Sequence, residues 1–423
     1  MKNTLAFENS AAFAKSFDQQ DSLSAYRKQF LFPKHNGEEI VYFTGNSLGL
    51  QPVTTKSYLE QELSDWAQFG VEGHFLAKRP WFAYHEFLTE KMAKIVGALP
   101  EETIMMNQLT VNLHLMMVSF YRPTPSRYKI ICEGKAFPSD QYALQSQVAF
   151  HGLNRDAIVE IFPRAGEHCI RHEDIYSAIE EHKDSLALVM MGGVNYFSGQ
   201  VFDMEGITRA AHAVGAFAGF DLAHAAGNIR LNLHDWNVDF AVWCSYKYLN
   251  SGPGGVAGAF VHQRHLGNSR QPMFAGWWGH TKEERFLMED TFKPMDTAER
   301  FQLSNAPIFS MAACLASLTL FDEVGMNALI DKSQTLTAYL EYVINDINTR
   351  KNNCLEIITP EANRGCQLSI KAHGYGRKLY DALIANGVIP DWREPDVIRC
   401  APVPMYNSYL DIFRFGQILE RLL

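Results

Sequence analysis

Two apolar segments of strand length end in polar side chains whose types suit cofactor chemistry. The first, residues 216–222, contains Asp221 near its end and is followed by His224. The second, residues 239–245, leads into Tyr246, Lys247 and a glycine-rich loop. Because ligands of open α/β sheets bind beyond the carboxyl ends of the strands, we expect these groups to meet there. A carboxylate that keeps a pyridinium nitrogen protonated and a lysine that forms a Schiff base are the groups that pyridoxal phosphate (PLP) requires.

Each of these residues has a plainer explanation when it is taken alone. An aspartate at a strand end often forms a turn or caps a helix, and a lysine that follows a strand is usually solvated. The joint pattern favours the cofactor site, because Lys247 lies in an apolar and aromatic segment. An ammonium group is costly there unless it is paired or its pKa is lowered, which is the condition for a Schiff-base lysine.

Size and charge narrow the class of protein. At 423 residues the chain is long for one hydrophobic core, so we expect two domains. Hydrophobic residues make up 47% of it, an ordinary share for a globular protein. The formal net charge of -9 argues against a nucleic-acid partner, which would call for a basic surface.

Cysteine usage and the apolar runs bear on the compartment. The 7 cysteines are scattered, without a CxxC pair or clustering with histidine, so no metal site is predicted. Cysteines without a disulfide framework fit a reducing cytosol. No apolar run approaches the roughly 20 residues that span a bilayer, and the start has no signal-peptide pattern. We therefore expect a cytoplasmic protein with no membrane contact.

Three turns are placed to contact a ligand. Residues 44–52 contain two glycines and Ser47, a pattern that lets backbone approach a ligand and that also marks a plain connecting loop. The change from an apolar to a helical pattern at Leu109 and Thr110 predicts a helix N-terminus, a natural phosphate site, although an N-cap threonine has the same signature. Phe137 follows a predicted strand and could stack on a flat ring or fill the core.

Aromatic loops and one arginine suggest a pocket for an aromatic amino acid. His74 lies in a loop rich in aromatic residues, although a lone histidine is more often structural. Trp277 and its neighbour Trp278 are not both expected in the core, so a pocket or a subunit interface is plausible. Arg399 emerges from a short predicted strand and could clamp a carboxylate, although exposed arginines are usually just solvated.

The order of elements predicts an α/β fold. Residues 1 to about 40 are expected to be helical, and strands alternate with helices from about 100 to 265, which favours a mostly parallel sheet covered on both faces. No GxGxxG follows the first strand, so a dinucleotide fold is not indicated. We expect an N-terminal segment over residues 1–50, a large domain over 51–308 and a smaller α+β domain over 309–423.

Taken together, these residues resemble the kynureninases, PLP enzymes of the aspartate aminotransferase fold (fold type I), and most of all the eukaryotic-type members. The matching stretches follow the family order and span nearly the whole chain: 42–52, 109–115, 137–140, 220–228, 243–250, 276–280, 304–308 and 401–408. The resemblance implies a large domain with a mostly parallel sheet of seven strands between helices.

The resemblance also implies a role for each cofactor residue. Lys247 would carry the Schiff base, Asp221 would pair with the pyridinium nitrogen, and His224 would lie close to the ring. Phe137 would stack on the ring, beside Pro138, Ser139 and Asp140. The phosphate would be held by Leu109, Thr110 and Tyr246, joined by Trp277 and Asn305 from the other subunit of a homodimer.

For the substrate, the resemblance implies that Arg399 binds the α-carboxylate and that Ser47, His74 and Asn305 face the aryl end. One departure concerns the cofactor. The family often has a hydroxyl residue where this chain has Gly192, so that contact is either lost or supplied by Asn195 or Ser198.

The reaction implied by the resemblance is hydrolysis of the Cβ–Cγ bond of L-kynurenine or 3-hydroxy-L-kynurenine. The products are L-alanine and anthranilate or 3-hydroxyanthranilate, in tryptophan catabolism towards NAD, and His74 with Asn305 favours the 3-hydroxy substrate. A cysteine desulfurase or selenocysteine lyase of the same fold is the alternative. That chemistry needs a mobile nucleophilic cysteine, whereas Cys366 and Cys400 lie in strand-like segments. A binding protein with this fold but no activity is disfavoured by the presence of Lys247, Asp221 and Tyr246 together.

Overall fold

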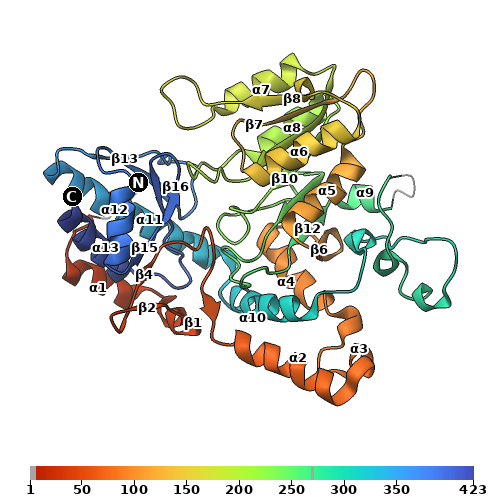
Figure 1. Ribbon diagram of the computed structural model, residues 1–423, viewed down its shortest axis with the longest axis horizontal. Helices are drawn as coiled ribbons and strands as arrows, with labels where there is room; N and C mark the ends of the chain where they lie inside the picture. The colour runs from red at the N-terminus through yellow and green to blue at the C-terminus, as the bar shows by residue number, and fades with distance from the viewer. Residues whose placement is uncertain (1–5, 268–270) are drawn as a thin grey trace.

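The computed structural model describes residues 6–267 and 271–423. A larger body is built on a seven-stranded sheet, and a smaller body holds a four-stranded antiparallel sheet. Figure 1 shows the first helix, α1 (Ala11–Gln20), beside the last, α13 (Tyr409–Leu422), so both ends of the described chain lie in the smaller body.

The seven-stranded sheet has the order β6-β12-β11-β10-β9-β7-β8. Strand β12 is antiparallel to both of its neighbours, and the other neighbouring pairs are parallel, which confirms the prediction of a mostly parallel sheet. The strands are β6 (Thr103–Met105), β7 (Lys129–Glu133), β8 (Ile158–Ile161), β9 (Leu186–Gly192), β10 (Phe217–Asp221), β11 (Phe240–Trp243) and β12 (Gly258–Val261).

Both faces of this sheet are covered by helices, because its central strands are mostly apolar. Alternate residues of β9 enter different cores: Val189 and Met191 pack on one face, and Leu188 and Met190 on the other. The first face meets α4 (Glu86–Val96), α7 (His172–Glu181), α8 (Met204–Ala213) and α10 (Ile308–Val324). The second face meets α5 (Leu109–Phe120) and α6 (Pro138–Phe150). This two-sided burial is what a continuous apolar strand predicts.

The smaller body combines a sheet of order β13-β14-β17-β16 with three helices. Its strands are β13 (Leu355–Ile357), β14 (Leu368–Ala372), β16 (Asp391–Arg393) and β17 (Val397–Cys400), and its helices are α11 (Met326–Arg350), α12 (Arg377–Ala385) and α13. The N-terminal segment joins this body, since α1 packs on α13 and β4 (Val41–Tyr42) pairs with β15 (Val388–Ile389).

The expectation that residues up to about 40 are helical was wrong for most of the segment. After α1 the chain forms a 3-10 helix (Ser24–Gln29) and then the short strands β1 (Phe30–Leu31), β2 (Lys34–His35) and β3 (Glu38–Glu39). Asn36 and Gly37 connect β2 to β3 with φ of 51° and 86°. An Asn-Gly pair at positive φ is the preferred hairpin turn, so residues 34–39 form a β-hairpin in place of a helix.

Helix α10 follows the predicted boundary near residue 308 but packs against α4 and α2 (Thr55–Phe69), which belong to the larger body. The boundaries 1–50, 51–308 and 309–423 therefore stay a proposal. Within the described residues no single helix is long and apolar enough to cross a membrane. Helices α10 and α11 pass that test only as a pair, and they are bent by 83°.

Phe220 is fully buried in β10 directly before Asp221, so its side chain anchors the strand that carries the acid. We expect Phe220→Ala to destabilise the protein by ~3–5 kcal/mol, through lost burial and the cavity left behind. The measurement is the urea unfolding midpoint, with Phe150→Ala as the control because Phe150 is 78% exposed. Equal midpoints for the two variants would contradict this account of the core.

Candidate active site

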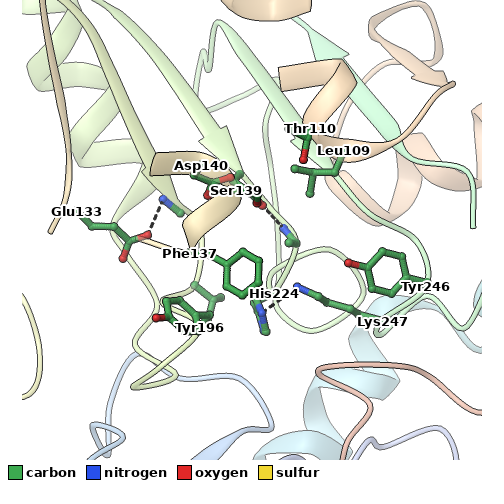
Figure 2. A pocket seen from close by; sticks show the side chains of 14 residues that line it. Leu109, Thr110, Glu133, Phe137, Ser139, Asp140, Tyr196, His224, Tyr246 and Lys247 are labelled. Carbon is green, nitrogen blue, oxygen red and sulfur yellow. Dashed lines mark hydrogen bonds between the residues drawn. The ribbon is translucent and has the colours of Figure 1, made fainter. Parts of the chain in front are cut away.

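A pocket with about 530 Å³ of empty volume, partly open to solvent, lies beyond the carboxyl ends of β7, β9, β10 and β11. Figure 2 shows side chains from these strand ends and from the first turns of α5 and α6 pointing into it. Its lining contains most of the predicted cofactor residues. The full set is Leu109, Thr110, Glu133, Phe137, Ser139, Asp140, Gly192, Val194, Tyr196, Asp221, Ala223, His224, Tyr246 and Lys247.

The Lys247 amine lies near the middle of the pocket. Its Nζ is 3.0 Å from Nε2 of His224 and 5.9 Å from the centre of the Phe137 ring. Burial, with the nearby charges of Lys247 and Arg399, lowers the pKa of His224 well below its usual range. The imidazole is therefore neutral at physiological pH and can accept a hydrogen bond from the lysine ammonium.

Two buried aspartates lie on the opposite side of the pocket. Burial raises the pKa of both, and more strongly that of Asp140, because the charge of Asp221 lies beside it. The backbone N–H of Ala223 donates to Asp221 Oδ1 at 2.6 Å, and Lys247 also favours the ionised form of Asp221. We infer that Asp140 holds the proton and Asp221 the charge, as a carboxylate that faces a pyridinium nitrogen must.

Glu133 is a third buried acid that the sequence interpretation missed. It ends β7, and burial raises its pKa to about 7 despite hydrogen bonds from Gly192 and Asn195, with Asp221 adding to the rise. Its position could have been found from the apolar run at residues 130–132, since Glu133 is the next residue. Tyr196 was missed too, and its ring stands edge-on to that of Phe137, with centres 5.3 Å apart.

The departure at Gly192 is accounted for by Glu133. A Cβ at position 192 would lie 2.7 Å from Glu133 Oε1, so the acid occupies the space beside the glycine. Asn195, which was expected as a substitute contact, donates to Glu133 at 2.6 Å, and Ser198 in turn donates to Asn195 at 3.0 Å. Neither Asn195 nor Ser198 lines this pocket.

The pocket fits PLP by the chemistry of its donors and acceptors. Helix α5 begins at Leu109 without a side-chain cap, so the N–H groups of its first turn are available to a phosphate. Among the described residues that line the pocket, two buried polar atoms have no hydrogen-bond partner, Asp140 Oδ1 and His224 Nδ1. Phe137, 43% exposed, offers a ring face to a flat ligand.

The predicted turn at residues 44–52 packs against the backbone of Tyr246 and Lys247. Gly49 N–H donates to the carbonyl of Tyr246 at 2.8 Å, and a Cβ on Gly49 would lie 2.3 Å from the carbonyl oxygen of Lys247. A glycine is therefore required at position 49 for close backbone approach. The approach is to the lysine segment, whereas the sequence led us to expect a ligand.

Several predicted site residues lie outside the pocket of their own chain: Ser47, His74, Pro138, Trp277, Asn305 and Arg399. The ring of His74 stands edge-on to Trp81, Trp277 is 44% exposed, and Asn305 lines a separate cavity beside residues 105–108. Trp278 is buried, so the two tryptophans differ as expected.

Arg399 is fully buried behind the pocket wall. Its Nη1 donates to the Tyr196 carbonyl at 2.5 Å, and its Nη2 lies 2.8 Å from Asp391 Oδ2.

Solved structures with this architecture identify the fold. A cysteine desulfurase from Escherichia coli has a TM-score of 0.76 at 16% identity, covering 95% of this chain and 98% of its own. The enzyme C-DES, with glycine covalently linked to its PLP cofactor, has a TM-score of 0.74 at 16% identity, covering 90% and 96%. An alanine–glyoxylate aminotransferase from Nostoc sp. has a TM-score of 0.66 at 14% identity, covering 93% and 98%. Fold and pocket together define an enzyme of PLP fold type I.

Sequence relatives name the family. Residues 329–419 match the model of the kynureninase C-terminal domain. The chain is 58% identical to the kynureninase of Flavobacterium psychrophilum over 99% of both chains, and 53% identical to that of Myxococcus xanthus over 99% of both. It is 48% identical to the kynureninase of Nematostella vectensis, covering 97% of this chain and 93% of the other. The chain belongs to the kynureninase family, which confirms the predicted family and enzyme class.

The contact at Gly49 is open to a direct test. We expect Gly49→Ala to cost about 1–3 kcal/mol of stability through overpacking and to shift the Lys247 backbone, which should weaken cofactor binding. The measurements are thermal unfolding and the absorbance of the bound cofactor during titration with PLP. Gly267→Ala is the control, because a Cβ there meets nothing within 4 Å. Unchanged cofactor affinity in Gly49→Ala would refute the role of this contact.

Proposed function

We propose that this chain is a PLP-dependent hydrolase that cleaves the Cβ–Cγ bond of L-kynurenine and 3-hydroxy-L-kynurenine. The products are L-alanine and anthranilate or 3-hydroxyanthranilate. The observation that carries the proposal is 58% identity over 99% of the chain to a kynureninase. The joint presence of Lys247, Tyr246 and Asp221 in one pocket supports it.

Bound PLP supplies an electron sink for the carbon atoms of the amino acid. The chain's own residues then hold and move protons around it. Lys247 would hold the cofactor and carry the α-proton. The neutral His224 would assist by accepting a hydrogen bond from the Lys247 amine. Asp221, the charged member of the acid pair, would keep the pyridine nitrogen protonated.

Tyr246 is the candidate proton donor to the carbon that leaves the aryl ketone. Burial, with Cys244 and Asp221 nearby, raises the pKa of its phenol well above the usual value, so the hydroxyl is protonated at neutral pH. A general acid must carry its proton at the working pH. Leu109 and Thr110 would bind the phosphate at the N-terminus of α5, and Arg399 would bind the substrate α-carboxylate.

A cysteine desulfurase activity is less well supported. The fold neighbours with that name are only 16% identical, which speaks for the fold alone. Burial raises the pKa of Cys366 to about 12 and that of Cys400 well above its usual range. Neither thiol would be a thiolate at neutral pH, and neither is exposed.

A homodimer with shared active sites is supported by an exposed aromatic surface, formed by Phe75, Leu76, Trp277, Phe286, Leu287 and Met288. Each of these side chains is at least 44% exposed, and ring contacts through Phe82 connect Phe75 to Phe286. Exposed apolar patches of this kind mark interaction sites. His74 and Trp277 belong to the same region and would reach the pocket of the second copy, together with Asn305. The cytoplasm remains our proposal for the compartment, since all 7 cysteines are free.

Replacing the central lysine tests the function directly. With PLP added, the unmodified protein should release equal amounts of alanine and aromatic amine from either kynurenine. Lys247→Ala should lose both this turnover and the absorbance band of the bound cofactor, because no other amine lines the pocket among the described residues. Lys183→Ala, on the exposed surface, is the control. Alanine release by Lys247→Ala would refute the assignment.

Substrate preference is tested at His74, where we propose that the ring hydroxyl of the 3-hydroxy substrate is recognised. His74→Phe removes a polar partner, so the ratio of kcat/KM between the two substrates should narrow. Steady-state kinetics with both substrates measures this ratio. If it is the same in the variant, the imidazole has no part in selecting the substrate.

Shared sites predict that two inactive variants restore each other. Lys247→Ala and Asn305→Ala should each be poorly active, and mixing them under subunit exchange should recover activity. In a mixed pair, one site carries both substitutions and the other carries neither. Light scattering should give the mass of a dimer for each sample. A monomer, or a dimer without recovered activity, would rule out sharing.

A further inference from the structure

Glu133 accepts hydrogen bonds through both oxygens of its buried carboxyl group. Gly192 N–H donates to Oε1 at 3.2 Å, and Asn195 Nδ2 donates to Oε2 at 2.6 Å. Glu133 is only 4% exposed, and its side chain lines the pocket (Figure 2). It makes no ion pair among the described residues, so these two donors are what compensate its burial.

The orientation of the Asn195 amide is fixed by its other end. Oδ1 accepts from Phe197 N–H at 3.0 Å, from Ser198 N–H at 2.8 Å and from Ser198 Oγ at 3.0 Å. This is an Asx turn, in which the side chain organises the following backbone. If the amide turned over, all three bonds would be lost, so Nδ2 must face Glu133. Both partners of Glu133 are therefore obligatory donors, and only a group that accepts twice fits between them.

The turn held in this way connects the pocket to Arg399. Tyr196 follows Asn195 directly, its ring lines the pocket, and its carbonyl accepts from Arg399 Nη1 at 2.5 Å. The same carbonyl accepts from Gln367 Nε2 at 3.2 Å. A displacement of Asn195 would thus move the Tyr196 carbonyl, to which the Arg399 guanidinium donates.

The missing side chain at Gly192 leaves room for this arrangement. A Cβ there would lie 2.7 Å from Glu133 Oε1, and the carboxyl cannot retreat without giving up one of its two donors. Position 192 and Glu133 are therefore coupled sterically.

We propose that Glu133 is a positioning residue for the substrate carboxylate, which acts through the Asn195 turn and Tyr196 on Arg399 and depends on the absence of a side chain at Gly192. The inference rests on the proposed function, in which Arg399 binds the α-carboxylate. Glu133 would affect the affinity for the amino acid more than the chemical step.

The protonation state of Glu133 gives this role a signature. Its pKa is raised to about 7 by burial. The ionisable groups that face it are Asp221 from β10, Asp140 from α6, Cys132 on its own strand and Tyr196 from the turn. Above about pH 7 both oxygens of the ionised carboxylate accept hydrogen bonds, from Gly192 and Asn195. Below this pH one oxygen carries a proton, and the hydrogen bonds that hold the Asn195 turn weaken. Affinity should therefore fall as the pH falls through this value.

The test uses the PLP-loaded enzyme and L-alanine, a probe that has the α-carboxylate but no aryl group. Its Kd is read from the change in cofactor absorbance on titration. In Glu133→Gln the new side-chain amide group would face either Gly192 N–H or Asn195 Nδ2, and two donors cannot bond to each other. We therefore expect the Kd for L-alanine to rise about tenfold or more. The KM for kynurenine should rise similarly, with a smaller change in kcat and the same Kd for PLP. Wild type should lose affinity for L-alanine as the pH falls through about 7, and this loss should be absent in Glu133→Gln.

Glu160→Gln is the matched control, because Glu160 lies on the neighbouring strand β8 and also accepts from a glutamine amide, Gln141. It should leave the Kd for L-alanine unchanged. An unchanged Kd in Glu133→Gln, with wild type active on kynurenine, would overturn the inference and leave the proposed function standing. Wild type that binds PLP but cleaves neither kynurenine would instead count against the proposed function.

A double-mutant cycle tests the steric coupling and does not depend on the behaviour of the glutamine variant. Gly192→Ala should raise the Kd for L-alanine in the wild-type background, because the new Cβ displaces the carboxyl. In the Glu133→Ala background the same substitution should have no further effect, since the atom it meets is gone. Additive effects of the two substitutions would overturn the inference.

Discussion

The structure depends on the balance of charges around one partly buried amine, that of Lys247. Lys247 lies beside a neutral imidazole, and three carboxyl groups share the same pocket. Burial alone would neutralise all of these groups. The backbone N–H of Ala223 and the attraction of Lys247 retain the charge of Asp221, while Asp140 takes the proton. The pocket thus keeps Asp221 charged beside a protonated Asp140 and a neutral His224, as a pyridine cofactor requires.

The sheet is what places these groups together. Asp221 pairs in register with Gly192 on one side and Val242 on the other, so the ends of β9, β10 and β11 lie at one level. Two helix N-termini, those of α5 and α6, face the same edge. The polar ends of three apolar strands therefore converge without any long loop to order, and this limits the entropy cost of building the site.

Much of this arrangement could be predicted from the sequence, because it depends on local pattern. Apolar runs fixed the position of Asp221 and Lys247 at strand ends, and a change of periodicity marked the start of α5 at Leu109. Glu133 escaped prediction because its function depends on a contact with Gly192, which lies 59 positions away in sequence. Residues 30–39 were misjudged, because they form short strands, two of them joined by an Asn-Gly turn, where a helix was expected.

Residues whose role depends on a second chain lie beyond such reasoning. His74 lies in the short helix α3 (Gly73–Leu76), Trp277 in a 3-10 helix and Asn305 in a loop, and the pocket of their own chain does not include them. Their assignment to the site comes from the family resemblance.

The first crossing between the two bodies has a mechanical consequence. The chain leaves the smaller body at Phe43, whose N–H and carbonyl are bonded to Ile389 and Ala401, and only six residues later Gly49 donates to Tyr246 in the larger one. The segment from Phe43 to Gly49 is too short to allow a large rotation of one body while its contacts at both ends are kept. A hinge movement of the smaller body would therefore pull on the peptide that carries Lys247. Such a movement could not occur without displacing the amine.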